Sequence, residues 1–376
     1  MKKLLIAALF LLSNYSYALD LPTAPPPELA AKAWLLMDAN SGQVLVAHDA
    51  DRRIEPASLT KLMAAYLDFA AIKQGRMKLT DVIPVSDRAW KTEGSRMFVE
   101  PNKPVTVDEL LHGMIIQSGN DATVALAENV GGSEAGFVSM MNKEAQRLGM
   151  THTHFVTATG LPDPQHYTTA LDLSLIATAI IRDYPEFHPL YSIKEYRYNN
   201  ITQPNRNRLL WSDPSVDGMK TGHTENAGYC LIASAHRGER RLLSVVLGAN
   251  TDALRAAESQ RLLNYGFQFF DSAKLYRKDQ AVATIKVWKG SESNVKVGFV
   301  RDLYLSIPRG RSADLKTTMS TQQPLLAPLR RGQTVGTLTV SLDNKVLATY
   351  PLQALETVGV ASFIGRAWDG LMLKFK

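Results

Sequence analysis

The stretch Pro56-Ala57-Ser58-Leu59-Thr60-Lys61 begins the apolar run on which the fold depends. Apolar residues recur at i, i+3, i+4 and i+7 over residues 59–71, so the run predicts a buried helix that ends near Gly75. Ser58 and Lys61 are three residues apart and therefore share one face of the first turn. A serine becomes a good nucleophile when a base takes its proton, and burial at a helix N-terminus favours the neutral, basic form of a lysine amine.

This spacing alone does not establish a catalytic pair. Ser293 and Lys296 repeat it elsewhere in the chain, and Ser58 by itself also fits the ordinary role of a helix cap. The case for chemistry at the first pair therefore depends on the residues that accompany it.

Length and composition describe a folded protein. The chain has 376 residues, of which 45% are hydrophobic and 21% charged, enough for two domains or one large one. The mild net charge of +6 suits an anionic membrane or wall surface, and no basic cluster resembles a nucleic-acid groove. Cys230 is the single cysteine, so an internal disulfide is excluded, and its apolar surroundings indicate a small core residue.

The first residues predict an export signal. Lys2 and Lys3 precede a short apolar core at 4–12, and Ser16-Tyr17-Ala18 is a small-x-small cleavage site. The apolar core is too short to span a bilayer. We therefore expect residues 1–18 to be a signal peptide cut after Ala18, which lowers the net charge by two, from +6 to +4.

Residues 19–272 predict an α/β (α+β) domain in which helices flank an antiparallel sheet. A hairpin at 34–47 opens the domain, and it is expected to join three late strands. Helices and strands are predicted at 107–116, 121–130, 169–181, 219–224, 229–235, 242–247 and 253–270, with capping boxes that begin at Thr106 and Thr169. The loop at 148–167 is expected to rim the active site.

The end of the chain has a different character. Short β-rich runs alternate with turns over residues 273–357 and predict a small all-β domain. Residues 358–376 then place Val360, Phe363, Trp368 and other apolar residues on one helical face. A terminal amphipathic helix with aromatic residues and cations is typical of an in-plane membrane anchor, although such a helix can also dock on its own domain.

Two triplets accompany the Ser58–Lys61 pair. Ser118-Gly119-Asn120 falls in the break between two predicted helices, and Lys220-Thr221-Gly222 lies on a predicted edge strand. The first members of the three motifs are separated by 60 and then 102 residues. Each triplet alone is weak, since the first is an ordinary turn and Lys220 an ordinary surface lysine. The ordered set S-x-x-K, S-x-N, K-T-G in an exported chain is the signature of penicillin-recognising serine enzymes.

With these motifs, and with the stretches 205–211, 217–224 and 307–311, the chain resembles the low-molecular-mass penicillin-binding proteins of the D-alanyl-D-alanine carboxypeptidase type, peptidase family S11. The resemblance covers essentially the whole chain. It implies a transpeptidase- or β-lactamase-like domain, a β-domain pedestal and peripheral attachment to the periplasmic face of the bacterial inner membrane. It further implies a role in cell wall biogenesis and cell shape, with β-lactam antibiotics as acylating ligands.

The resemblance implies a serine carboxypeptidase that removes the terminal D-alanine from peptidoglycan pentapeptide stems. Ser58 is the expected nucleophile, which forms an acyl-enzyme. Lys61 is the expected general base, kept neutral by the helix terminus and by a second cation, Lys220. Ser118 is implied as a proton shuttle to the leaving amine, and Asn120 as a holder of the substrate amide and of Lys61.

The third motif is implied to bind the substrate. Lys220 and Thr221 are expected to hold its terminal carboxylate, with help from Arg206, and Gly222 to let its backbone lie against the strand. The backbone N–H groups of Ser58 and His223 are expected to hold the oxyanion.

No cofactor or metal is expected. His152, His154 and His166 lie close in the sequence, but they form no H-E-x-x-H or similar helical pair.

Two other functions share parts of this pattern. A class A serine β-lactamase carries a glutamate between the second and third motifs, but residues 145–185 contain no Glu and have Asp163 instead. A non-catalytic wall-binding scaffold is expected to lack part of the motif set, and none is missing here. Endopeptidase cleavage of cross-links by the same site stays open.

Overall fold

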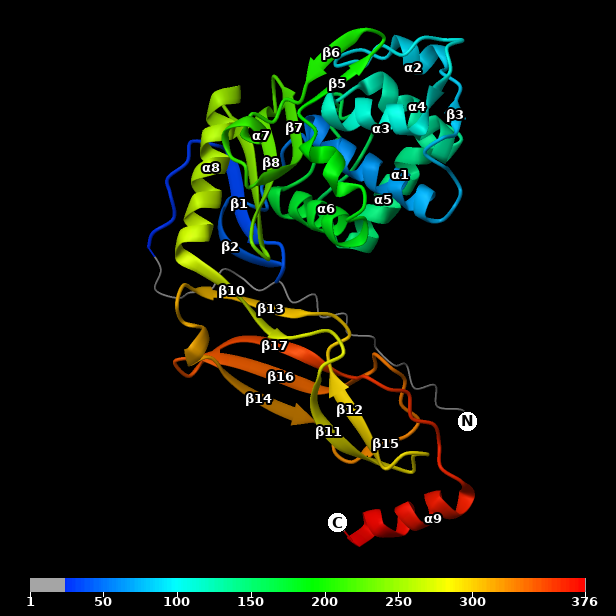
Figure 1. The fold of residues 1–376 in the computed structure, drawn as a ribbon, viewed down its shortest axis with the longest axis vertical. Coiled ribbons are helices and arrows are strands. Elements are labelled where there is room, and N and C mark those ends of the chain that lie inside the picture. Colours follow the sequence, from blue (N-terminus) through cyan, green and yellow to red (C-terminus); the bar gives the residue numbers. More distant parts are fainter. Residues whose placement is uncertain (1–23, 376) are drawn as a thin grey trace. The chain divides into compact units, whose positions relative to one another are not determined.

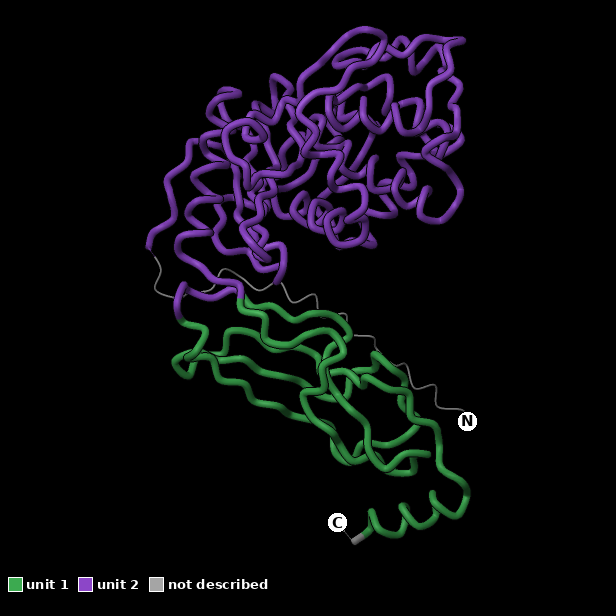
Figure 2. The backbone as a smooth tube through the Cα atoms, viewed as in Figure 1, with its two compact units in different colours: residues 1–21, 273–305, 311–376 green, residues 22–272, 306–310 purple. Residues whose placement is uncertain are grey.

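The computed structural model describes residues 24–375, so the predicted signal peptide lies outside the described residues. The chain divides into two compact units (Figure 2). The N-terminal unit contains residues 24–272 and 306–310, and the C-terminal unit contains residues 273–305 and 311–375.

A five-stranded antiparallel sheet forms the centre of the N-terminal unit, in the order β2-β1-β9-β8-β7 (Figure 1). The early hairpin joins the late strands because β1 pairs with β9, as the sequence predicts. The edge position predicted for the K-T-G strand is also confirmed, since β7 has one neighbour. The strands are β1 (Ala33–Asp38), β2 (Gln43–His48), β7 (Val216–Thr224), β8 (Gly228–Arg237) and β9 (Arg240–Ala249).

Helices cover both faces of this sheet, so the core has two layers. The helix α8 (Asp252–Phe269) packs on one face, where Leu262 and Leu263 meet residues such as Leu231 and Val246. A larger layer lies between the other face and the remaining long helices. These are α1 (Lys61–Lys73), α3 (Val107–Ile116), α4 (Asn120–Gly131), α5 (Glu134–Leu148) and α6 (Ala170–Asp183).

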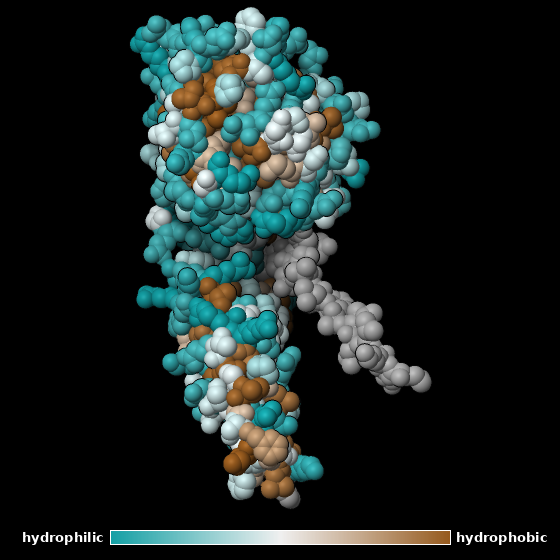
Figure 3. Space-filling model, turned by 90° about the vertical axis from the view of Figure 1, so that its right-hand side faces the viewer, coloured by the Kyte–Doolittle hydropathy of each residue, from teal (hydrophilic) through white to brown (hydrophobic). Residues whose placement is uncertain are grey.

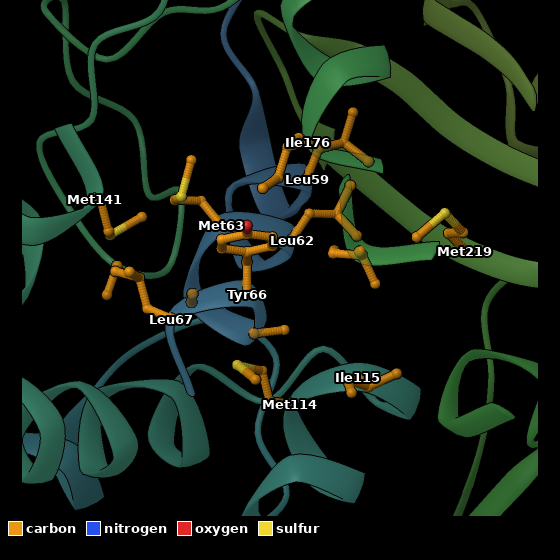
Figure 4. Close-up of a cluster of buried hydrophobic side chains, with 14 of the residues drawn as sticks. Leu59, Leu62, Met63, Tyr66, Leu67, Met114, Ile115, Met141, Ile176 and Met219 are labelled. Carbon is orange, nitrogen blue, oxygen red and sulfur yellow. The ribbon is translucent and has the colours of Figure 1, made fainter. Parts of the chain in front are cut away.

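The helix α1 runs through the middle of the larger layer (Figure 4). A short 3-10 turn, η1 (Ala57–Thr60), precedes it, so Ser58 lies in this turn and Lys61 begins the α-helix. Nearly every side chain of α1 is buried, and Leu59, Leu62 and Tyr66 contact the surrounding helices. Removing such a buried side chain is expected to cost about 2–5 kcal/mol of stability, because the cavity cannot fully collapse.

Caps fix where the other helices begin and end. The capping box of Thr106 and Glu109 is present at the start of α3, and Gly132 ends α4 in the left-handed conformation. Thr169 caps α6 by accepting a hydrogen bond from the backbone N–H of Asp172. The Asp172 side chain does not return this bond, since it accepts from His152 N and Thr153 Oγ1. The predicted capping box at Thr169 is therefore only half formed.

Several elements have no counterpart among the sequence predictions. The longest is α5, whose start is capped by Ser133. A second hairpin joins β5 (Glu195–Tyr198) to β6 (Ile201–Pro204) ahead of the Arg206 loop. The others are η2 (His188–Ser192), α2 (Asp87–Lys91), α7 (Leu209–Ser212), β3 (Val82–Ile83) and β4 (Val105–Thr106).

The C-terminal unit is rich in strands, as predicted. Its main sheet has the order β14-β16-β17-β12-β11-β15, and all its neighbours are antiparallel except β11 and β15. A smaller sheet pairs β10 (Phe270–Tyr276) with β13 (Leu303–Pro308). The main strands are β11 (Ala281–Trp288), β12 (Asn294–Gly298), β14 (Lys316–Thr321), β15 (Leu325–Leu326), β16 (Thr334–Leu342) and β17 (Lys345–Ala354); the 3-10 turn η3 (Ser312–Asp314) precedes β14.

The predicted terminal helix is present as α9 (Phe363–Met372), followed by the turn η4 (Leu373–Phe375). Ser362 caps its start, and no residue of α9 is buried. Phe363, Ile364 and Trp368 are 78%, 81% and 64% exposed. Apolar side chains accordingly gather at the end of the unit that α9 occupies (Figure 3). Among the described residues, no helix is long and apolar enough to cross a membrane.

Candidate active site

Ser58 is presented by a tight turn that packs against two other segments. Ala57, just before it, has φ of +48°, a conformation that non-glycine residues rarely adopt and that is concentrated at functional sites. Gly160 lies so close to this turn that a Cβ there would be 1.8 Å from the carbonyl oxygen of Ala57. A Cβ on Gly222 would lie 3.1 Å from the carbonyl oxygen of Pro56. The two glycines therefore allow the backbone to approach the nucleophile turn from both sides.

The close approach at Gly222 has a partner within the protein, because the position of a Cβ there lies close to the 56–59 turn. The room that this glycine leaves for the substrate backbone stays a prediction.

Lys61 is buried directly behind Ser58. Its Nζ lies 3.2 Å from Ser58 Oγ, 2.7 Å from Asn120 Oδ1 and 2.7 Å from the carbonyl oxygen of Thr159. The last two atoms can only accept hydrogen bonds. A neutral amine has two N–H groups and one lone pair, so these two acceptors use both N–H groups. The lone pair is thereby left facing the Ser58 hydroxyl, as a base requires.

Burial lowers the pKa of Lys61 to about 7, with a further lowering from the positive charge of Arg206 and an opposing effect from Asp121. From the sequence we expected Lys220 to supply the second positive charge. The pKa of Lys220 is itself well below its usual value, because of burial first and then of Lys61, Arg206 and Arg255. A site with this many cations and so little water favours a neutral amine at Lys61.

The second motif forms the turn between α3 and α4. Ser118 has φ of +65° and is almost fully buried, and its Oγ accepts a hydrogen bond of 2.9 Å from Lys220 Nζ. Asn120 uses Oδ1 for Lys61 and donates from Nδ2 to the carbonyl oxygen of Glu93, 2.6 Å away. The turn therefore connects the first motif to the third and also fixes the loop that carries Gly94.

The third motif lies on the edge strand β7. Lys220 and Thr221 are 3% and 5% exposed, whereas His223 is exposed. Lys220 Nζ donates to Ser118 Oγ and to the carbonyl oxygen of Thr221, at 2.9 and 3.0 Å. This contact brings the second and third motifs together although they are 102 residues apart.

A cleft of about 850 Å³ opens in front of these motifs. It is large enough for a peptide end and carries few apolar side chains. The predicted residues that reach it are Ser58, Ser118, Arg206, Thr221, Gly222 and His223, while Lys61, Asn120 and Lys220 lie buried behind them. The structure thus brings all nine candidate site residues together, six at the surface of one cleft and three beneath it.

The loop at 148–167 contributes through its backbone. The carbonyl oxygen of Thr159 accepts from Lys61, and Gly160 packs on Ala57. His166 is buried at 2% exposure, with Nε2 3.0 Å from Thr60 Oγ1, and burial lowers its pKa to about 4. This histidine therefore stays neutral at ordinary pH and ties the loop to the nucleophile turn.

Several residues of the site carry no sequence signal that could have found them. Thr159 acts through a backbone carbonyl, which any residue type supplies. Asp121 is fully buried, and its carboxylate accepts from the backbone N–H groups of residues 97–99. Trp211, Asp252 and Arg255 also line the cleft. Among residues 24–375, no group of three or more His, Cys, Asp and Glu side chains could hold a metal ion.

A hydroxyl nucleophile with a buried neutral amine, a second serine and a cationic edge strand define a class, the serine enzymes of acyl transfer. The comparisons with known proteins agree. Residues 21–251 match the family model of peptidase S11, D-alanyl-D-alanine carboxypeptidase, and residues 270–360 match that of the C-terminal domain of penicillin-binding protein 5. The chain therefore belongs to peptidase family S11, the D-alanyl-D-alanine carboxypeptidases.

Similar proteins match over nearly the whole length. D-alanyl-D-alanine carboxypeptidase DacC of Escherichia coli is 45% identical, covering 98% of this chain and 94% of its own. DacA of the same organism is 41% identical, covering 97% and 93%. Among solved structures, penicillin-binding protein 5 of Haemophilus influenzae is 42% identical with a TM-score of 0.84, covering 89% of this chain and 99% of its own.

A further solved structure carries an antibiotic. Penicillin-binding protein D2 of Listeria monocytogenes, in its ampicillin-bound form, is 31% identical with a TM-score of 0.60. It covers 65% of this chain and all of its own. The likeness to these proteins confirms the fold predicted from the sequence. The comparisons give no support to the β-lactamase or scaffold alternatives.

Proposed function

We propose that this chain is a serine-type D-Ala-D-Ala carboxypeptidase that acts through an acyl-enzyme on Ser58. The single observation that carries the mechanism is the position of Lys61, whose Nζ lies within hydrogen-bond distance of Ser58 Oγ, Asn120 Oδ1 and the carbonyl oxygen of Thr159. Lys61 takes the hydroxyl proton as Ser58 Oγ attacks the carbonyl carbon of the penultimate D-alanine. General-base help of this kind contributes about 10²–10⁴-fold.

The second and third motifs complete the first half of the reaction. As the C–N bond breaks, the proton that Lys61 took from Ser58 passes through the Ser118 hydroxyl to the leaving amine, which leaves Lys61 neutral again. Lys220, 2.9 Å from Ser118 Oγ, supports this transfer. Asn120 holds Lys61 and the substrate amide. The developing oxyanion lies between the backbone N–H groups of Ser58 and His223, whose fixed dipoles stabilise the transition state.

The terminal carboxylate of the substrate binds at the cationic part of the cleft. Thr221 and Arg206 both line this part, and Lys220 lies beneath it. Among the described residues Arg206 makes no ion pair or hydrogen bond within the protein, so its guanidinium is free to receive a carboxylate. Water then attacks the acyl-enzyme with Lys61 again as base, which releases the shortened stem peptide and restores the Ser58 hydroxyl.

The same reaction path explains an expected response to antibiotics. The Listeria monocytogenes relative has been solved with ampicillin bound. We propose that β-lactams acylate Ser58 here, because their ring carbonyl and carboxylate match the two ends of a D-Ala-D-Ala unit.

Localisation is the other part of the proposal. We propose that residues 1–18 are a signal peptide that directs export. Residues 19–272 form the catalytic domain, and residues 273–357 form the β-domain that serves as its pedestal. Residues 358–376 attach the protein to the periplasmic face of the inner membrane. The support is the exposed apolar side chains of α9, which a water-exposed helix does not keep without a partner surface. The attached enzyme then acts on peptidoglycan in wall biogenesis and cell shape.

One assay tests the catalytic proposal directly. The purified chain, incubated with a peptide ending in D-Ala-D-Ala, should release free D-alanine, and a fluorescent penicillin should label it. Neither release nor labelling would contradict the proposal. For localisation, a chain that ends before Val360 should no longer sediment with anionic vesicles, and sedimentation that persists would show that the helix is not the anchor.

A further inference from the structure

Two arginines of one loop face the cleft but differ in their partners. The loop reads Asn205-Arg206-Asn207-Arg208, and the side chains alternate, since both asparagines are buried and both arginines are exposed and line the cleft. Asn207 anchors the loop by donating to the carbonyl oxygen of Gly218, 2.9 Å away. Arg206 has no ion pair among residues 24–375, whereas Arg208 Nε pairs with Asp252 Oδ2.

Asp252 connects this loop to the K-T-G strand. It is the first residue of α8, and its other oxygen, Oδ1, pairs with Arg255 Nη2. Arg255 is 5% exposed, and its Nη1 donates to the carbonyl oxygens of Gly222 and Cys230, at 3.2 and 3.4 Å. A continuous series of charged contacts, Arg208–Asp252–Arg255, thus joins the loop to the strand on which the substrate is proposed to lie.

The loop places the two arginines next to each other at the cleft. Arg206 and Arg208 are two residues apart, and both line the same cleft as Ser58 and Trp211. The Arg208–Asp252 pair therefore lies in the cleft close to the residue that is proposed to bind the terminal carboxylate. A substrate whose terminal carboxylate binds at Arg206 brings its last residue near that pair.

We propose that the Arg208–Asp252 ion pair, with Trp211 beside it, is the end wall of the leaving-group side and restricts cleavage to a small terminal D-amino acid. This inference rests on the proposed function. Arg208 is held in an ion pair with Asp252, so its guanidinium is less available than that of Arg206 to bind the carboxylate. A leaving residue with a long side chain, such as one that belongs to a second cross-linked stem peptide, has to separate the pair before it fits. The wall thereby favours carboxypeptidase over endopeptidase action.

Two peptides test the wall. One ends in D-Ala-D-Ala, and the other ends in D-Ala followed by Nε-acetyl-D-lysine, which keeps the α-carboxylate and adds a long side chain. The quantity to measure is the ratio of kcat/KM for the second peptide to kcat/KM for the first. In R208A/D252A, which removes one charge of each sign, the ratio should rise about fivefold, the size of effect that an exposed ion pair can supply.

A conservative variant and a distant pair serve as controls. R208K keeps a cation opposite Asp252 and should keep the ratio near that of the wild type. Lys73 and Glu186 form an ion pair of 3.5 Å outside the cleft, so K73A/E186A should leave the ratio unchanged.

The outcomes separate this inference from the proposed function. An R208A/D252A ratio within twofold of the wild-type value overturns the wall, as does an equal fall in kcat/KM for both peptides, because that pattern indicates a role in carboxylate binding. Release of neither D-alanine nor acetyl-D-lysine by the wild type overturns the proposed function and the wall together.

Discussion

The chain contains two S-x-x-K pairs, and only one of them has surroundings that make chemistry possible. Lys61 is 1% exposed and its Nζ is 3.2 Å from Ser58 Oγ. Lys296 has an exposed side chain in the C-terminal unit, and its Nζ forms an ion pair of 3.4 Å with Glu356. Ser293 is also exposed and directly precedes the first residue of β12, Asn294.

The difference lies in how the same spacing is folded. On a helical turn, residues three apart share a face, so Ser58 and Lys61 meet. On a strand, successive side chains alternate between faces, and residues three apart point away from each other. Burial then lowers the pKa of Lys61 to about 7. A sequence motif therefore predicts a site only together with the element that carries it.

The largest effect that separates the two pairs is expected from removal of the hydroxyl. Ser58→Ala should abolish labelling by a fluorescent penicillin and lower D-alanine release by at least about 10³-fold, because no other group can form the acyl-enzyme. Ser293→Ala should leave both unchanged. Labelling that survives in Ser58→Ala would mean that the nucleophile is misassigned.

The next effect is on pH dependence. Because the base form of Lys61 is neutral and its pKa is about 7, the acylation rate should rise about tenfold per pH unit below that value and level off above it. In Lys61→Met the rate should fall and the inflection should disappear, whereas Lys296→Met should keep the wild-type profile. Stopped-flow measurement of penicillin acylation checks this, and a wild-type profile that is flat around pH 7 would contradict it.

The lowered pKa of Lys61 also makes the stability of the folded protein depend on pH. The folded state lacks a proton that the unfolded state binds between the folded pKa of about 7 and the ordinary value of 10.5, so the contribution of Lys61 to the free energy of unfolding should rise with pH across this window.

A smaller effect is expected where the loop supports the nucleophile turn. Gly160→Ala places a Cβ against Ala57 and also puts alanine at φ of +83°, so it should lose more than about 1 kcal/mol of stability and label more slowly. Gly310→Ala is the matched control, since Gly310 has φ of +79° and a Cβ there would meet no atom within 4 Å. Equal losses in Tm for the two variants would show that the contact with Ala57 is unimportant.

The smallest effect is expected at the second lysine. Lys296→Ala removes an exposed ion pair, whose contribution is expected to be less than about 0.5 kcal/mol, and should not change D-alanine release. Thermal unfolding and the release assay check both. A marked loss of release would show that the C-terminal unit takes part in catalysis.

The fold could be predicted where local signals are strong. The periodic apolar run of α1, the capping box at Thr106 and the continuous apolar runs of the late hairpin each specify their own element. The helix α5 was not predicted, although Ser133 caps its start and its buried apolar residues Phe137, Met141 and Ala145 recur every four positions. Hairpin β5–β6 was not predicted, although Tyr196 and Tyr198 of β5 alternate with exposed residues; its signal is short, and none of its residues is fully buried.

The site could be predicted to the extent that side-chain types carry its chemistry. Ser58, Lys61 and Lys220 were found through motifs. The residues that position them were not found. Thr159 acts through its backbone carbonyl, and Gly160 is required because it has no side chain at a close backbone contact. Arg208 and Asp252 are 44 residues apart in the chain, and no local sequence pattern connects them. Such contacts exist only once the tertiary fold has formed.

The single cysteine makes this protein well suited to site-specific labelling. Cys230 is fully buried in β8, and burial raises the pKa of its thiol to about 11, so thiol reagents should leave it untouched in the folded protein. A cysteine introduced at an exposed position, for example in place of Ile364 on α9, would then be the only reactive thiol. A fluorophore attached there would report directly on the depth and orientation of the helix at a lipid surface, with no native residue to remove first.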